Sequence, residues 1–188
     1  MTEMSAPPSD AVFRAEMVAA IPRLRSFARG LCGNRDLADD LAQEALVKAW
    51  AARASYKPGT NFRAWLFTIL RNHFYSLARR ASRFAPWDPD LAARTLITPA
   101  DQGVNIHFGD LERGLGLLPA EQREALILVT AQGLSYEEAA TIMGCAVGTI
   151  KSRVARARTA LTRYLEGDDP ALVAPRPAEA RAEVLPQT

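Results

Sequence analysis

Residues 134–161, LSYEEAATIMGCAVGTIKSRVARARTAL, decide the fold of the C-terminal half of this 188-residue chain. Ser135 and Glu138 have the S-x-x-E spacing of a capping box, which predicts the start of a helix. The two alanines after Glu138 let a second helix cross closely, and Gly144 can take the positive φ of a turn. Ile150 can pack between the two helices. This spacing is typical of a DNA-binding helix-turn-helix.

The second helix of this motif is expected over roughly residues 147–163. The side chains that should face the core recur at helical spacing: Ile150, Val154, Ala157 and Leu161. The other faces carry cations and small polar groups, and no acid occurs over residues 147–165. Such cations can reach base edges and phosphates in a major groove. A helical hairpin with a basic exposed face is the alternative, but charge and geometry together favour DNA binding.

The first 82 residues predict a compact domain of three or four helices. Apolar side chains recur every three or four positions over residues 13–31, where Pro22 is expected to kink or break the helix. Asn34 or Asp36 can cap the next helix. A Pro-Gly loop then precedes Asn61, which can cap a third long helix.

The rest of the chain completes an all-α architecture of two small helical domains joined by a flexible linker. Residues 10–82 form the first domain and residues 110–166 the second. The proline-containing stretch 83–109 has little periodicity and predicts the linker, while the proline-rich residues 167–188 predict a disordered tail. Because nothing in the linker composition fixes one arrangement, we expect the two domains to be separable.

Composition excludes several classes of protein. Hydrophobic residues make up 48% and charged residues 23%, as in ordinary globular chains. The two cysteines are far apart, the two histidines lack metal-ligand spacing, and no nucleotide-binding glycine motif occurs. The chain also has neither a secretory leader pattern nor a membrane-length apolar run. We therefore expect a cytoplasmic protein that is not an enzyme, with no metal, cofactor, small-molecule substrate or membrane partner.

Charge is segregated along the N-terminal half. The nine residues 36–44, DLADDLAQE, hold four acids and no base, which is more than helix capping needs and suggests a basic protein partner. Residues 61–83 hold five arginines and no acid, interleaved with aromatic side chains. That pattern suits single-stranded nucleic acid, although most of these aromatics can equally be core. Asn72 lies among them and could pair with an extruded base.

Four stretches, in this order, resemble the extracytoplasmic-function (ECF) group of bacterial sigma factors: DLADDLAQEALVKAW (36–50), NFRAWLFTILRNHFYSLARR (61–80), LPAEQREALILV (118–129) and residues 134–161. The resemblance spans about residues 10–166. The sequences AEQREALILV and GCAVGTIKSRV are similar to the general-stress, EcfG-type branch of alphaproteobacteria. That branch implies control by an anti-sigma factor of the NepR type, which a response regulator with a sigma-like decoy domain removes.

The resemblance also implies roles for individual residues. The helix that binds the clamp of core RNA polymerase would use Asp36, Asp39, Asp40, Gln43 and Glu44. The −10 element would be melted and read by Asn61, Arg63, Trp65, Arg71, Asn72, Arg79 and Arg80, with Asn72 in the pocket for a flipped base. The −35 element would be read by Thr149, Lys151, Ser152, Arg153, Ala155, Arg156 and Arg158. Alanine at position 155 can touch a thymine methyl group but accepts no hydrogen bond.

Two other functions compete with a sigma factor. A sigma-like decoy module would need a receiver domain, for which residues 167–188 are too short, and it would not need a fully basic recognition helix. An ordinary helix-turn-helix regulator would not need both an acidic helix and a basic–aromatic helix. The sequence therefore predicts a sigma factor that directs promoter-specific transcription initiation, in a stress response, for bound RNA polymerase.

Overall fold

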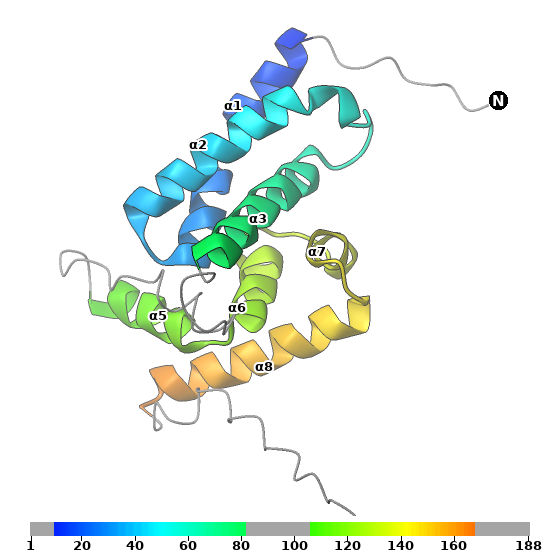
Figure 1. The fold of residues 1–188 in the computed structure, drawn as a ribbon. Helices are drawn as coiled ribbons and strands as arrows, with labels where there is room; N and C mark the ends of the chain where they lie inside the picture. Colours follow the sequence, from blue (N-terminus) through cyan, green and yellow to red (C-terminus); the bar gives the residue numbers. More distant parts are fainter. Residues whose placement is uncertain (1–9, 82–105, 168–188) are drawn as a thin grey trace, which may run out of the picture.

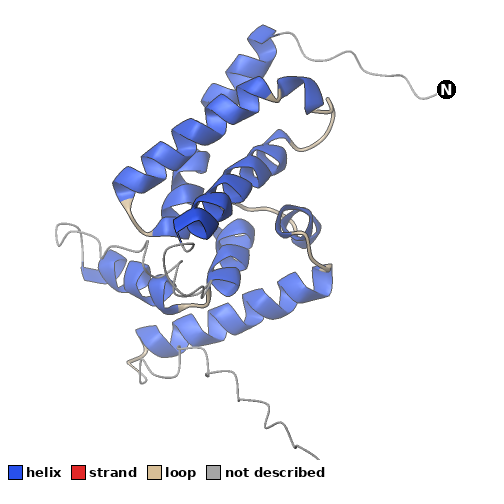
Figure 2. Cartoon of the chain, in the orientation of Figure 1, coloured by secondary structure: helices blue, strands red, loops and turns tan. Residues whose placement is uncertain are grey.

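The computed structural model describes residues 10–81 and 106–167, with side chains from residue 110 onward in the second range. All regular structure in these two ranges is helical (Figure 2). Nearly all of the predicted linker and tail therefore lies outside the described residues. Among the described helices, none has the length and apolarity needed to cross a bilayer.

Residues 10–81, here called the N-terminal module, contain three long helices and one short one. They are α1 (Asp10–Cys32), α2 (Arg35–Ala51), the 3-10 helix η1 (Arg53–Ser55) and α3 (Phe62–Ala81). The three α-helices pack on one another (Figure 1). Their facing stripes form an aromatic and aliphatic core that includes Phe13, Phe27 and Phe67.

Helix α1 is continuous through Pro22, so of the expected kink or break the break is wrong. Proline lacks an N–H, and its ring crowds the preceding turn, so it normally disfavours a helix interior. Pro22 lies on the exposed face, while Leu24 and Phe27 on the inner face are fully buried. Burial of that apolar face on both sides of Pro22 offsets the lost hydrogen bond.

Asparagine side chains begin the other two long helices of this module. The backbone N–H of Leu37 donates to Oδ1 of Asn34 at 2.9 Å, so Asn34 and not Asp36 caps α2. The backbone N–H of Ala64 donates to Oδ1 of Asn61 at 3.1 Å, as predicted for the start of α3. Each cap satisfies one N–H that a helix start would otherwise leave unpaired.

Residues 106–167, here called the C-terminal module, contain four α-helices and one π-helical turn. They are α5 (Ile106–Leu117), α6 (Ala120–Leu126), its continuation η3 (Ile127–Ala131), α7 (Tyr136–Met143) and α8 (Val147–Leu165).

The helix-turn-helix forms from α7 and α8 as the sequence predicts. The N–H of Glu138 donates to Oγ of Ser135 at 3.1 Å, and the N–H of Ser135 donates to Oε2 of Glu138 at 2.8 Å. Gly144 ends α7 with a φ of 65°, and Ile150 is fully buried between the helices. The predicted capping box, the turn at Gly144 and the packing of Ile150 between the helices are thus all confirmed.

The two modules pack on each other. Buried side chains from both form one continuous hydrophobic cluster, and the guanidinium of Arg123 in α6 donates to the carbonyl of Leu31 near the end of α1 at 3.1 Å. In Figure 1, α6 and α7 lie against the N-terminal module, and α8 lies on the far side of α6 from α3. A direct contact between the modules, absent from the sequence prediction, thus sets this arrangement.

Candidate nucleic-acid and polymerase interfaces

The acidic residues of α2 lie mainly on its outer face. The exposed members of the predicted set are Asp36, Asp40, Gln43 and Glu44. Asp39 is half-buried and is held by Arg25, whose Nε and Nη2 donate to its two carboxylate oxygens at 2.6 and 2.5 Å. These hydrogen bonds keep the pKa of Asp39 below its ordinary value. Within the described residues, the exposed acids of this set without a cation partner are therefore Asp36 and Asp40, while Oε2 of Glu44 lies 3.4 Å from Nζ of Lys48.

The predicted −10 residues of α3 divide by exposure. Those open to solvent are Asn72, Arg79 and Arg80, and those half-buried are Asn61, Arg63, Trp65 and Arg71. The exposed group lies in the C-terminal half of the helix. Asn72, the candidate base-pocket residue, is thus accessible to a ligand.

Most aromatic side chains of α3 belong to the core. Phe62, Phe67 and Phe74 are buried. The half-buried ring of Trp65 has its centroid 5.3 Å from that of Tyr56 and 6.0 Å from that of Phe13. The aromatics of α3 therefore serve mainly in packing, and its exposed charge is carried by Arg79 and Arg80 near the end of the helix.

Arg71 is held by a carboxylate of the C-terminal module. Its Nε donates to Oε1 of Glu124 at 2.5 Å, and the hydroxyl of Tyr75 donates to the other oxygen of Glu124 at 2.9 Å. Glu124 is fully buried, and this burial raises its pKa while the Arg71 guanidinium opposes the rise. Burial also raises the pKa of Tyr75, which keeps its hydroxyl a donor.

Asn61 is held in the same way. Its Nδ2 donates to Oε1 of Glu138, the residue that closes the capping box of α7. The backbone N–H of Ser135 and the amide of Asn61 both stabilise this carboxylate and lower the pKa of Glu138. Two predicted −10 residues therefore face carboxylates of the other module.

The predicted −35 residues of α8 are mostly open. The exposed members are Lys151, Ser152, Ala155, Arg156 and Arg158. Thr149 and Arg153 are half-buried, and Arg153 pairs with Glu121 and donates to Sγ of Cys145 at 3.4 Å. Arg153 is thus committed to the internal structure of its module.

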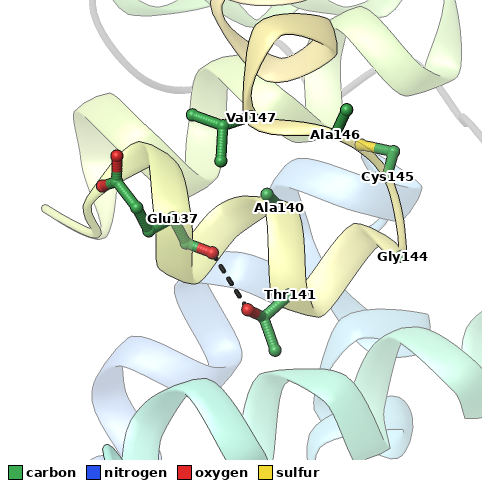
Figure 3. A pocket seen from close by; sticks show the side chains of 7 residues that line it. All are labelled: Glu137, Ala140, Thr141, Gly144, Cys145, Ala146 and Val147. Atoms are coloured by element: carbon green, nitrogen blue, oxygen red, sulfur yellow. Dashed lines mark hydrogen bonds between the residues drawn. The ribbon is translucent and has the colours of Figure 1, made fainter.

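A shallow hollow lies beside the turn of the helix-turn-helix (Figure 3). Thr141 donates its hydroxyl to the carbonyl of Glu137 at 3.0 Å along one wall. Most of the side chains that line the hollow are small, and among them are one carboxylate and no cation: Glu137, Ala140, Thr141, Gly144, Cys145, Ala146 and Val147. The side chains of the hollow therefore offer no cation to a phosphate.

Comparisons with known proteins match both modules. Residues 17–84 match Sigma-70 region 2, and residues 108–161 match Sigma-70, region 4. The ECF RNA polymerase sigma factor EcfG of Rhodopseudomonas palustris is 51% identical over 155 residues, which cover 82% of this chain and 86% of that protein. The chain belongs to the sigma-70 family. Within that family it is an ECF sigma factor of the EcfG type, as its sequence predicts.

Two solved structures are similar to this sigma factor. The sigma factor RpoE of Bartonella quintana, solved in complex with the anti-sigma factor NepR, is 44% identical with a TM-score of 0.70. The match covers 84% of this chain and 99% of that one. CnrH, solved with the cytosolic domain of CnrY, is 28% identical with a TM-score of 0.62, covering 86% and 92% of the two chains.

The sequence prediction for this sigma factor missed the residues that join region 2 to region 4. The sequence indicates a capping role for Glu138 and gives neither Glu124 nor Glu138 a partner in the other module. One signal for Glu124 was present: it is followed directly by the apolar run ALILV. A carboxylate at the edge of a buried run needs a buried donor, and the arginines of α3 are candidates.

Proposed function

We propose that this ECF sigma factor binds core RNA polymerase through the acidic face of α2, opens and reads the −10 element through α3, and reads the −35 element through α8. The observation that carries the proposal is the separation of charge on these helices. Asp36, Asp40 and Glu44 are exposed on α2, whereas α3 and α8 carry cations and no acid. The protein works in the cytoplasm and has no catalytic chemistry of its own.

An anti-sigma factor of the NepR type is the proposed regulator. The support is the similarity to RpoE of B. quintana, which was solved in complex with NepR. The similarity to EcfG supports a role in transcribing general stress-response genes. In this scheme the regulator competes with polymerase for the free sigma factor.

Run-off transcription with purified core polymerase on a promoter library tests the proposal. We expect transcripts that start downstream of a shared −35 and −10 pair. Asp36→Ala/Asp40→Ala should lower affinity for core by at least about tenfold, since charge-assisted contacts contribute about 1.5–3 kcal/mol each. Glu137→Ala/Glu166→Ala removes the same charge from exposed positions outside α2 and should not. Equal competition for core by both double variants would contradict the role of α2.

The role of Asn72 has a separate test. Asn72→Ala should keep core binding and closed-complex formation but fail to open duplex promoter DNA, because extruding a base costs a few kcal/mol that its pocket must offset. A template already mismatched around −10 removes that cost and should restore activity. An equal defect on duplex and mismatched templates would place the fault in folding or polymerase contact.

A further inference from the structure

The hydroxyl group of Ser152 links the side chain of Arg156 to the backbone of α8. Nη2 of Arg156 donates to Oγ of Ser152 at 3.3 Å, and the hydroxyl of Ser152 donates to the carbonyl of Thr149 at 2.9 Å. Ser152 and Arg156 are both exposed, so burial in a core does not account for their contact. The two hydrogen bonds tie the guanidinium to the first turn of the helix, which begins at Val147.

The first turns of α8 are the part of a recognition helix that meets DNA. In a helix-turn-helix, the N-terminal residues of the second helix contact base edges in the major groove. An exposed arginine samples many rotamers and loses this freedom when it binds a base. A hydrogen bond that already holds the guanidinium toward the first turn reduces the loss. The contact with Ser152 therefore lowers the free-energy cost of placing Arg156 on a base.

The hydrogen bonds of Ser152 also limit what its hydroxyl can offer to a base. A serine hydroxyl has one proton and two acceptor lone pairs. Its proton goes to Thr149 and one lone pair receives Arg156, so Ser152 cannot donate to a base acceptor while both bonds are intact. Arg156 uses one N–H group on Ser152 and keeps the others for the two acceptors of a guanine. Of this pair, the arginine is the group suited to reading a base.

We propose that Ser152 is a positioning residue for Arg156 and does not itself read the −35 element. The inference rests on the proposed function of α8, and it changes the role that the sequence resemblance implies for Ser152. The hydroxyl acts on base choice through the arginine, because it favours the orientation in which the guanidinium meets a base edge. Loss of the hydroxyl should therefore matter only while Arg156 is present.

Two other cations of α8 are held by different partners. Arg153 pairs with Glu121, and Nζ of Lys151 lies 5.9 Å from the ring centroid of Tyr136. Neither of these contacts uses the hydroxyl of Ser152. Removal of that hydroxyl should therefore leave both cations in place, and Lys151 can serve as a reference in the experiment.

A double-mutant cycle on the full-length protein tests the positioning role. Fluorescence anisotropy measures affinity for the cognate −35 duplex, taken from the promoter found by run-off transcription, and for a scrambled duplex. We expect Ser152→Ala to lower the ratio of these two affinities by about fivefold, a usual size for the cost of ordering one long side chain. Ser152→Thr keeps a hydroxyl that can bond the preceding turn, and it should restore most of the ratio.

The same substitution in two further backgrounds identifies the residue through which Ser152 acts. In Arg156→Ala protein, Ser152→Ala should lower the ratio no further. In Lys151→Ala protein, Ser152→Ala should still lower it by about fivefold. Thr159→Ala is the matched control, because Thr159 is exposed on the same helix and donates its hydroxyl to the carbonyl of Ala155 at 3.1 Å. This control should leave the ratio unchanged.

The outcomes distinguish failure of this inference from failure of the function on which it rests. If Ser152→Ala lowers the ratio equally with and without Arg156, Ser152 reads the element itself and the positioning role is wrong. If Arg156→Ala lowers the ratio while Ser152→Ala does not, Arg156 reads a base without help from Ser152. A ratio unchanged by Arg156→Ala would remove the base-reading role of Arg156, and the inference with it.

Discussion

Helices α3 and α8 are alike in charge but differ in how far the fold leaves that charge exposed to solvent. Both are long, carry several arginines and contain no acid. In α3, Arg71 is bound by a buried glutamate of another module, whereas Arg156 and Arg158 of α8, both predicted −35 residues, lie open to solvent. A basic, acid-free helix thus predicts a polyanion surface, but only the tertiary packing decides whether that surface is available.

The largest expected difference between the two helices is in stability. Arg71→Ala leaves the buried carboxylate of Glu124 without its cation and should lower the free energy of unfolding by about 3–5 kcal/mol. Arg158→Ala removes an exposed cation and should change it by less than about 0.5 kcal/mol. Urea denaturation of both variants measures the difference. Equal midpoints would mean that the Arg71–Glu124 pair does not persist in solution.

The second test concerns base choice by the open helix. Arg156→Ala should cost about 1–3 kcal/mol of binding on the cognate −35 duplex and little on a scrambled duplex, because a base contact is lost. Anisotropy titrations of the two duplexes at one salt concentration measure this. The same loss on both duplexes would remove Arg156 from the base-reading set.

A smaller effect should distinguish the role of Arg158 in DNA binding from that of Arg156. Arg158→Ala should weaken cognate and scrambled duplexes alike and reduce the salt slope of log K by about 1, as expected for one lost phosphate contact. Titrations at several salt concentrations give the slope. A slope equal to that of the unaltered protein would show that Arg158 does not contact a phosphate.

The smallest expected effect is a pH dependence at the start of α3. Glu138 has a lowered pKa in the folded protein, so its stabilising contacts are complete above its ordinary pKa of 4.5 and are lost as pH falls through the folded value. The stability difference between the unaltered protein and Glu138→Gln should therefore shrink below about pH 4.5. Denaturation of both proteins at a series of pH values measures this stability difference. A difference that stays constant with pH would contradict the stabilising role of the ionised Glu138 carboxylate. Helix α8 has no acid and offers no matching group.

Local features of this fold could be predicted from sequence because they depend on neighbouring residues. The capping box of Ser135 and Glu138, the positive φ of Gly144 and the burial of Ile150 all follow from spacing within one motif. The cap by Asn61 is of the same kind. The break expected at Pro22 does not occur, because burial of the apolar face of α1 outweighs a local penalty.

The contact between modules could not be predicted because its partners are far apart in sequence. Arg71 and Glu124 are 53 positions apart, and Asn61 and Glu138 are 77 apart. Periodicity shows which face of a helix is buried but not which helix covers it. The pairing of Arg153 with Glu121 illustrates the same limit inside one module, since the spacing of the sequence does not indicate which carboxylate this predicted −35 residue contacts.

The side chain of Asn61 links the first turns of two helices. Its oxygen accepts from the N–H of Ala64 at the start of α3, and its nitrogen donates to Glu138, which itself accepts from the N–H of Ser135 at the start of α7. Helix starts ordinarily fray independently, and their amides exchange with solvent at unrelated rates. Here one opening event exposes both, so the N–H groups of Ala64 and Ser135 should exchange hydrogen for deuterium together, and faster once the modules are apart.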